Sequence, residues 1–167
     1  VLRIPLGLKR FSDVFACADE LVRAAESDAN ELSGTRDEAE RDALRTALGA
    51  GGTGKGTAAA TRGMAGALKE LERRQKSRAT RTQRDVLDLA LVDLAAFYRD
   101  VLVAASGAPA TLNHPDHADD AATAARNWTA ESTLRRLEAV LACREALELN
   151  VKPRIAVEAM VSALYLG

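Results

Sequence analysis

A glycine-rich stretch from Gly49 to Thr57 is the part of the sequence most suggestive of chemistry. A phosphate-binding loop has the pattern Gly-x-x-x-x-Gly-Lys followed directly by Ser or Thr, whose hydroxyl meets the Mg²⁺ of a bound nucleotide. Here Gly56 stands at the hydroxyl position, and residues 40–45 predict a charged helix where such a loop needs a buried strand. We therefore interpret residues 49–63 as a mobile linker, and we expect no nucleotide, other cofactor or small-molecule ligand.

The other residue types that do chemistry form no recognisable site. His114 and His117 flank Pro115-Asp116, but no second pair of ligands follows at the spacing of a zinc site. Cys17 and Cys143 stand within helical patterns, which is typical of small buried side chains in a reducing compartment. No Asp or Glu is singled out as a general acid or base. We expect a non-catalytic chain without a metal.

The composition predicts an all-α fold. A length of 167 residues fits one domain, and 47% of the residues are hydrophobic but only 4% aromatic. Ala, Leu, Arg and Glu, which are abundant here, are strong helix formers. The net charge of −1 makes no case for nucleic acid or an anionic membrane, and no apolar run reaches the ~18 residues of a membrane span. We expect one cytoplasmic helical domain over residues 1–167.

The spacing of apolar residues predicts a bundle of about five to six helices. The first begins at Ser12 as N-cap and carries an apolar stripe from Val14 to Leu32; Gly34 should interrupt or kink it before a second stretch that ends near Leu48. Helix resumes near Met64. Apolar residues surround the axis over 86–103, which indicates a central, buried helix that ends at Ser106-Gly107.

Three further helices are predicted in the last third of the chain. A short one covers 117–127, and the next starts at Thr129 and ends at Asn150 in a left-handed conformation. Pro153 then suits the first turn of a last helix. The apolar stripe of the second contains Leu134, Leu137, Val140, Leu141 and Leu147, and that of the third contains Ile155, Ala159, Met160, Ala163 and Leu164.

Charge is distributed unevenly along the first half of the chain. Residues 19–42 contain nine acidic side chains against three basic ones, whereas residues 69–84 contain seven basic side chains against two acidic ones. We favour a long antiparallel hairpin whose acidic and basic arms face each other, although each exposed pair contributes only ~0–1 kcal/mol. The alternative is a nucleic-acid-binding module that uses the basic 69–84 face to bind phosphates.

The second half carries a family resemblance. The segments that carry it are 84–94, which leads into 97–102, and the tail segments 133–147 and 150–159 with their Asn-x-x-Pro sequence. In these segments the chain resembles the C-terminal collar domain of the bacterial DNA polymerase III delta-prime subunit, in its actinobacterial form. The likeness covers nearly the whole chain and is firmest over 84–105 and 131–166. The long hairpin favours delta-prime over the related gamma/tau subunit.

The resemblance implies a role in assembly. In that family the helical collar domains of five subunits form a ring, from which AAA+ modules hang that open the sliding clamp on primed DNA. The chain starts at Val1, so we expect a fragment that lacks N-terminal AAA+ modules. The expected partners are clamp-loader subunits of gamma/tau and delta type, with DNA contacted only through the complex. A small nucleotide-hydrolysing enzyme is a third hypothesis, which would require Lys55.

Residues for contact with neighbouring subunits can also be named. Tyr and Arg are enriched at the centres of protein interfaces, which directs attention to Tyr98 and Arg99. The alternative is that both are ordinary residues at the edge of the core. The predicted interface residues are Tyr98, Arg99, Arg135, Arg144 and Asn150.

Overall fold

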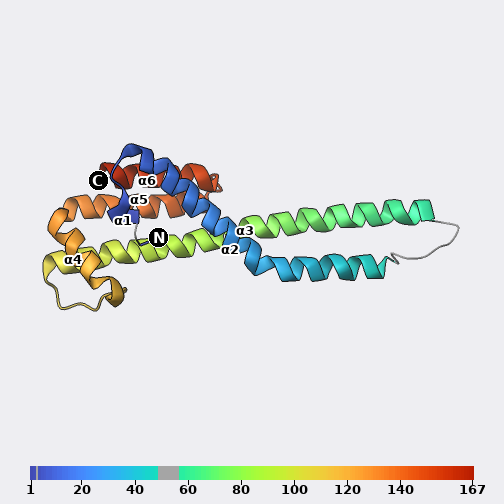
Figure 1. Ribbon diagram of the computed structural model, residues 1–167, viewed down its shortest axis with the longest axis horizontal. Coiled ribbons are helices and arrows are strands. Elements are labelled where there is room, and N and C mark those ends of the chain that lie inside the picture. The colour runs from blue at the N-terminus through green and yellow to red at the C-terminus, as the bar shows by residue number, and fades with distance from the viewer. Residues whose placement is uncertain (3, 49–56) are drawn as a thin grey trace. The chain divides into compact units, whose positions relative to one another are not determined.

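The computed structural model describes residues 1–2, 4–48 and 57–167, with residues 57–62 described by their backbone alone. The predicted all-α class is confirmed, since the described residues contain six α-helices, one 3-10 turn and no strand (Figure 1). The elements are α1 (Ile4–Gly7), α2 (Phe11–Ala47), α3 (Thr57–Ser106), the turn η1 (Pro115–His117), α4 (Ala118–Asn127), α5 (Ala130–Glu148) and α6 (Pro153–Leu166).

The chain divides into two compact units. Unit 1 comprises Val1–Ala25 and Arg84–Gly167, and unit 2 comprises Glu26–Gln83. Both long helices, α2 and α3, contribute to both units. Among the described residues, no helix is long and apolar enough to cross a membrane.

Unit 1 has a hydrophobic core built by four helices. The parts of α2 and α3 that belong to the unit pack with α5 and α6, and each completely buried Leu or Val stabilises the fold by roughly 1.5–3 kcal/mol. A smaller cluster joins Phe97 and Val101 of α3 to Ala121 and Ala124 of α4. The buried residues of the main core are Val14, Ala18, Leu21, Ala25, Leu87, Leu91, Leu94, Tyr98, Val140, Cys143, Leu147, Ala156, Val157, Met160, Val161 and Leu164.

Local hydrogen bonds set the helix starts. The prediction that Ser12 caps α2 is wrong: the Asp13 carboxylate instead accepts hydrogen bonds from the backbone N–H groups of Arg10 (2.9 Å) and Lys9 (3.2 Å). An acidic residue in the first turn that reaches back in this way satisfies donors the helix itself leaves unpaired. The predicted start of α5 is confirmed, since the Thr129 hydroxyl accepts from the Ser132 N–H at 3.1 Å.

The predicted helix ends are confirmed too. Asn150 has φ +64°, and the backbone N–H groups of Asn150 and Val151 bind the carbonyls of Leu147 and Ala146. This pair of bonds is the Schellman motif, which satisfies carbonyls that the end of α5 would leave free. Gly107, also at φ +64°, follows the end of α3, and Pro153 opens α6.

Two predicted breaks differ from the structure. Gly34 does not interrupt the first helix, because α2 is helical from Phe11 to Ala47. The predicted linker 49–63 is too long, because residues 57–63 are helical and α3 begins at Thr57, not near Met64. Residues 49–56, which include the glycine-rich motif and Lys55, lie outside the described residues.

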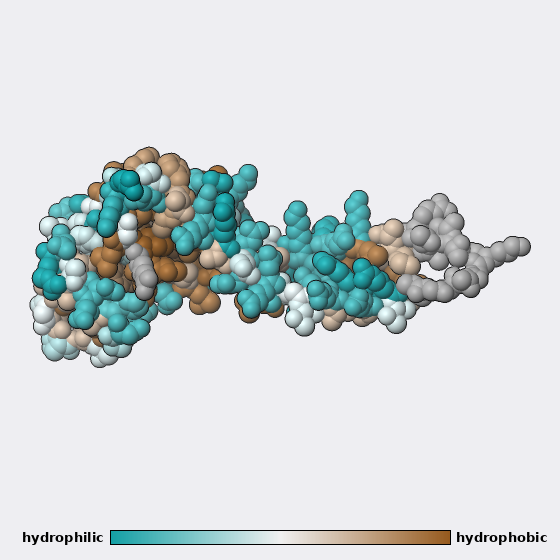
Figure 2. Space-filling view, viewed as in Figure 1, coloured by the Kyte–Doolittle hydropathy of each residue, from teal (hydrophilic) through white to brown (hydrophobic). Residues whose placement is uncertain are grey.

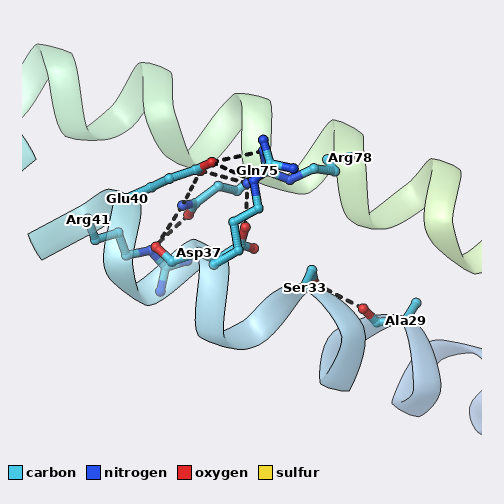
Figure 3. Close-up of polar contacts among 8 residues, drawn as sticks. Ala29, Ser33, Asp37, Glu40, Arg41, Gln75 and Arg78 are labelled. Carbon is cyan, nitrogen blue, oxygen red and sulfur yellow. Dashed lines mark hydrogen bonds and ion pairs between the residues drawn. The ribbon is translucent and has the colours of Figure 1, made fainter. Parts of the chain in front are cut away.

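Unit 2 is a helical hairpin joined largely by polar contacts (Figure 3). Arg78 of α3 binds Asp37 (2.5 Å) and Glu40 (2.6 Å) of α2. The buried Gln75 amide donates to the Asp37 carbonyl at 2.9 Å, and its oxygen accepts from Arg41 at 2.8 Å. The predicted contact between an acidic and a basic arm is therefore present, although it is concentrated on a single arginine.

Candidate protein-interaction surface

Arg99 is bound within unit 1. Its guanidinium donates to the Thr111 carbonyl (2.7 Å) and to the carboxylate of Asp100 (3.0 Å). Asp100, only 1% exposed, also accepts from the backbone N–H groups of Asn113 (3.0 Å) and His114 (2.8 Å). Burial alone raises the pKa of this carboxyl group, but the hydrogen bonds outweigh burial and the pKa is lowered. Arg99 and Asp100 together fix the backbone segment that follows the end of α3.

Tyr98 belongs to the core of unit 1. Its side chain is 0% exposed and lies beside Trp128, with 6.0 Å between the ring centroids. Burial raises the pKa of its phenol, and the hydroxyl has no hydrogen-bond partner within the described residues. Arg136 lies over the Trp128 ring at 4.5 Å, a distance typical of a cation–π contact. The ring of Tyr98 therefore lies inside the unit and not on its surface.

The three remaining predicted residues also make contacts inside unit 1. Arg135 of α5 donates twice to the carbonyl of Gly167, at 3.1 and 2.9 Å. Arg144 binds Asp88 of α3, and Asn150 accepts from Arg84, one turn before Asp88 on α3. The structure thus brings Arg144 and Asn150 to one stretch of α3. It does not join the five predicted residues into one patch, and their contact with a neighbouring subunit stays a prediction.

Exposed apolar side chains lie on α3 and on α5, and together they are here called the α3/α5 surface. Val92 is 40% exposed, Leu134 46% and Leu141 47%, and Leu89 extends the surface on α3. The prediction of an all-round buried helix over 86–103 is therefore wrong at Leu89 and Val92. The predicted buried stripe of α5 is likewise wrong at Leu134 and Leu141, because a four-helix core covers only part of each stripe.

A second exposed apolar area, the α2/α6 surface, is aromatic. The rings of Phe11 and Phe15 meet edge to face at 5.6 Å, and Phe11 lies 6.0 Å from Tyr165 of α6. Both phenylalanines are about half exposed. Figure 2 shows hydrophobic residues reaching the surface over the helices of unit 1, among hydrophilic ones. Exposed apolar area of this kind marks sites where proteins bind one another.

Two other predicted stripe positions are also corrected. Leu32 of α2 and Ile155 of α6 belong to predicted apolar stripes, yet their exposed fractions are 71% and 56%. Leu32 lies in unit 2, where one neighbouring helix covers only a narrow strip of α2. Ile155 lies in the first turn of α6, where Ala156 and Val157 face the core instead.

Unit 1 also has an open cleft of about 820 Å³, lined largely by the N-terminal residues and α2. Cys17, Glu20 and His117 are among its lining residues. Burial raises the pKa of the Cys17 thiol, which keeps it protonated at neutral pH and weakens it as a nucleophile. The ring of His117 is hydrogen-bonded to Asp120 at 3.0 Å. The cleft offers apolar volume but no activated nucleophile.

The two histidines are close together but separately engaged. Their ring centroids are 6.4 Å apart, and the His114 ring contacts the Asp93 carbonyl at 3.1 Å. Within the described parts of the chain, no group of three or more His, Cys, Asp or Glu side chains is placed to hold a metal ion.

The basic arm of unit 2 is partly neutralised by its own helix. Arg73 and Arg74 both bind Glu70, at 2.9 and 3.0 Å, and these hydrogen bonds lower the pKa of Glu70 to about 2. Lys69 and Lys76 are exposed and share a helix face with Arg73. A polyanion would therefore meet a basic arm in which Arg73 and Arg74 already have a carboxylate partner.

No protein-family model, curated protein or solved structure matches this chain.

The sequence analysis missed both exposed surfaces. The available signal was the spacing of Leu134 and Leu141, which lie seven residues apart with Glu138 between them, a pattern typical of helices that pack on a further helix. The aromatic pair Phe11 and Phe15 has the i, i+4 spacing of neighbours on one helix face.

Proposed function

We propose that this chain is a non-catalytic, cytoplasmic assembly domain, the collar domain of the delta-prime subunit of a bacterial clamp loader. Its partners would be gamma/tau-type and delta-type subunits, with which it holds together the ring that loads the sliding clamp onto primed DNA. The observation that carries the assembly role is the pair of exposed apolar surfaces on unit 1, one over α3 and α5 and one at α2 and α6. The choice of subunit rests on the sequence resemblance over 84–105 and 131–166.

The geometry supports this role because a ring subunit must contact two neighbours. Such a domain needs apolar surface beyond its own core, and it needs that surface in two places. Unit 1 has the two surfaces on different helix pairs, and Arg144 and Arg135 help to fix the helices that carry them. The long hairpin of unit 2 favours delta-prime over the gamma/tau collar domain.

Co-purification tests the proposal. The 167-residue chain, carrying an affinity tag, is mixed with gamma/tau-type and delta-type clamp-loader subunits, and we expect a stoichiometric complex on size-exclusion chromatography. Phe15→Ser, on the α2/α6 surface, should weaken the complex. Leu32→Ser removes an equally apolar side chain that is 71% exposed on unit 2, and it should leave the complex intact. A folded chain that captures neither subunit would overturn the proposal.

A nucleic-acid-binding module is the second candidate, favoured by the exposed row of Lys69, Arg73 and Lys76. It predicts affinity for a labelled DNA duplex that falls steeply with salt and is lost when the three residues are changed to Glu. The assembly proposal predicts no such affinity for the isolated chain.

A further inference from the structure

We propose that the α3/α5 surface is a docking site for an amphipathic helix of a partner protein that carries Lys or Arg beside its apolar stripe. The inference deepens the proposed function and rests on it in taking unit 1 to be an assembly domain. It adds the place of one contact and the chemistry of the segment that fills it.

Helix geometry and one ion pair place the apolar side chains of the two helices on the same side. α3 and α5 run antiparallel within unit 1 (Figure 1), and the pair Asp88–Arg144 fixes their register. Val92 lies one turn after Asp88 on α3, and Leu141 lies one turn before Arg144 on α5, so both lie on the same side of the ion pair. Leu134 continues the row for two further turns, about 10 Å. This length suits about two turns of a partner helix.

Acidic side chains border this row. Glu138 lies one turn from both Leu134 and Leu141, and Glu145 lies one turn beyond Leu141. Both are exposed, as is Asp85 on α3, and none of the three takes part in an ion pair within the described residues. They are therefore available to a partner.

Two basic side chains near the surface have carboxylate partners. Arg144 is held by Asp88, and Arg99 donates to Asp100 and to the Thr111 carbonyl. The border of the surface is consequently acidic. Charge complementarity favours a basic segment and disfavours an acidic helix or nucleic acid. The leucines repeat every seven residues, and so do the glutamates beside them, as the core and flanking positions of a coiled coil do. The partner helix of such a coiled coil carries lysines opposite the glutamates.

The basic arm of a second copy does not supply such a helix. Its exposed face combines Lys69, Arg73 and Lys76 with Gly66, Ser77 and Thr80. It has charge but no apolar stripe to cover Leu134 and Leu141. The basic arm is therefore not the occupant, and the occupant that we propose is a segment of a different protein.

Two synthetic helical peptides test the inference on the 167-residue chain. Both have Leu and Ala alternating along one stripe, which limits self-association of the peptide, and they differ only in having Lys or Glu beside that stripe. Fluorescence anisotropy should show the Lys peptide binding at least tenfold more tightly than the Glu peptide. Raising the salt concentration should reduce this difference.

Variants locate the binding. L134Q/L141Q should weaken binding of the Lys peptide at least tenfold, whereas L149Q, which changes a 72% exposed leucine after α5, should change it less than twofold. E138K/E145K should reverse the preference in favour of the Glu peptide. The matched control E31K/E38K, on exposed residues of unit 2, alters the net charge equally and should leave the preference unchanged. Circular dichroism checks that each variant is folded.

Several results would overturn the inference. Equal affinities for the two peptides would do so, and so would binding that survives both L134Q/L141Q and E138K/E145K. A wild-type dimer in sedimentation that L134Q/L141Q makes monomeric, without peptide binding, would identify a second copy as the occupant. Subunit capture without peptide binding would leave the proposed function standing on another surface. Peptide binding without subunit capture would leave the docking site standing and remove the clamp-loader assignment.

Discussion

Arg144 of α5 holds Asp88 of α3 through two parallel hydrogen bonds, Nε to Oδ1 at 2.7 Å and Nη2 to Oδ2 at 3.0 Å. The bidentate geometry orients two helices that carry the core of unit 1. Because the two side chains are 31% and 40% exposed, solvent screens the pair. We expect a coupling free energy of about 1 kcal/mol from a double-mutant cycle of Asp88→Ala and Arg144→Ala, measured by urea unfolding. The matched cycle on Glu131 and Arg135 should give less, since that pair is more exposed.

The buried carboxylate of Asp100 should be among the most sensitive positions of unit 1. Asp100→Ala leaves the N–H groups of Asn113 and His114 without their acceptor, and we expect a loss of about 2–3 kcal/mol in the free energy of unfolding. Asp100→Asn, which keeps one acceptor oxygen, should cost less. Asp93→Asn, an exposed change two turns earlier on α3, should stay within about 0.5 kcal/mol in the same urea titration. An equal effect of the Asp93 and Asp100 changes would contradict this account.

Protonation of Glu40 should report on the hairpin of unit 2. Hydrogen bonds from Arg78 and then from Arg36 lower the pKa of Glu40 to about 2, below its ordinary value of 4.5. A carboxyl whose pKa is lowered by folding stabilises the fold above the ordinary value, and the stabilisation is lost as the pH falls from about 4.5 through about 2. NMR titration of the Glu40 carboxyl should show its pKa rising in Arg78→Gln. Arg74→Gln, which removes a partner of Glu70 instead, should leave the pKa of Glu40 unchanged.

The start and the end of α5 could be predicted because they depend on neighbouring residues alone. Thr129 has a hydroxyl that accepts from a backbone N–H three residues on, and Asn150 tolerates a positive φ. Exposed faces could not be predicted in the same way. Leu141 and Val140 are adjacent residues of the same predicted stripe, yet one is 47% exposed and the other 0%. Periodicity locates a stripe, but the width covered depends on where the other helices lie.

The predicted interface residues show the same difficulty for the site. Arg99, Arg135 and Arg144 are among the predicted interface residues, and arginine is frequent at interfaces, but arginine also has several donors and ties helix ends and loops within a domain. In this structure each of the three binds a group of its own unit. Residue type alone therefore cannot tell an arginine that binds a partner protein from one that binds a group of its own domain. The spacing of Leu134 and Glu138 is more informative about the site, because it specifies one face of α5.

Gly34 provides a direct test of whether α2 is one continuous helix. A Cβ placed at this position meets nothing within 4 Å, so Gly34→Ala introduces no clash. Alanine loses less backbone freedom in a helix than glycine, and we expect the free energy of unfolding to rise by about 0.5–1 kcal/mol. The control is Gly107→Ala, where φ is +64° and the same change should destabilise by about 1 kcal/mol despite equally open surroundings. Thermal unfolding followed by circular dichroism measures both. A loss of stability in Gly34→Ala would mean that a bend at this glycine, and not an uninterrupted helix, is the preferred state.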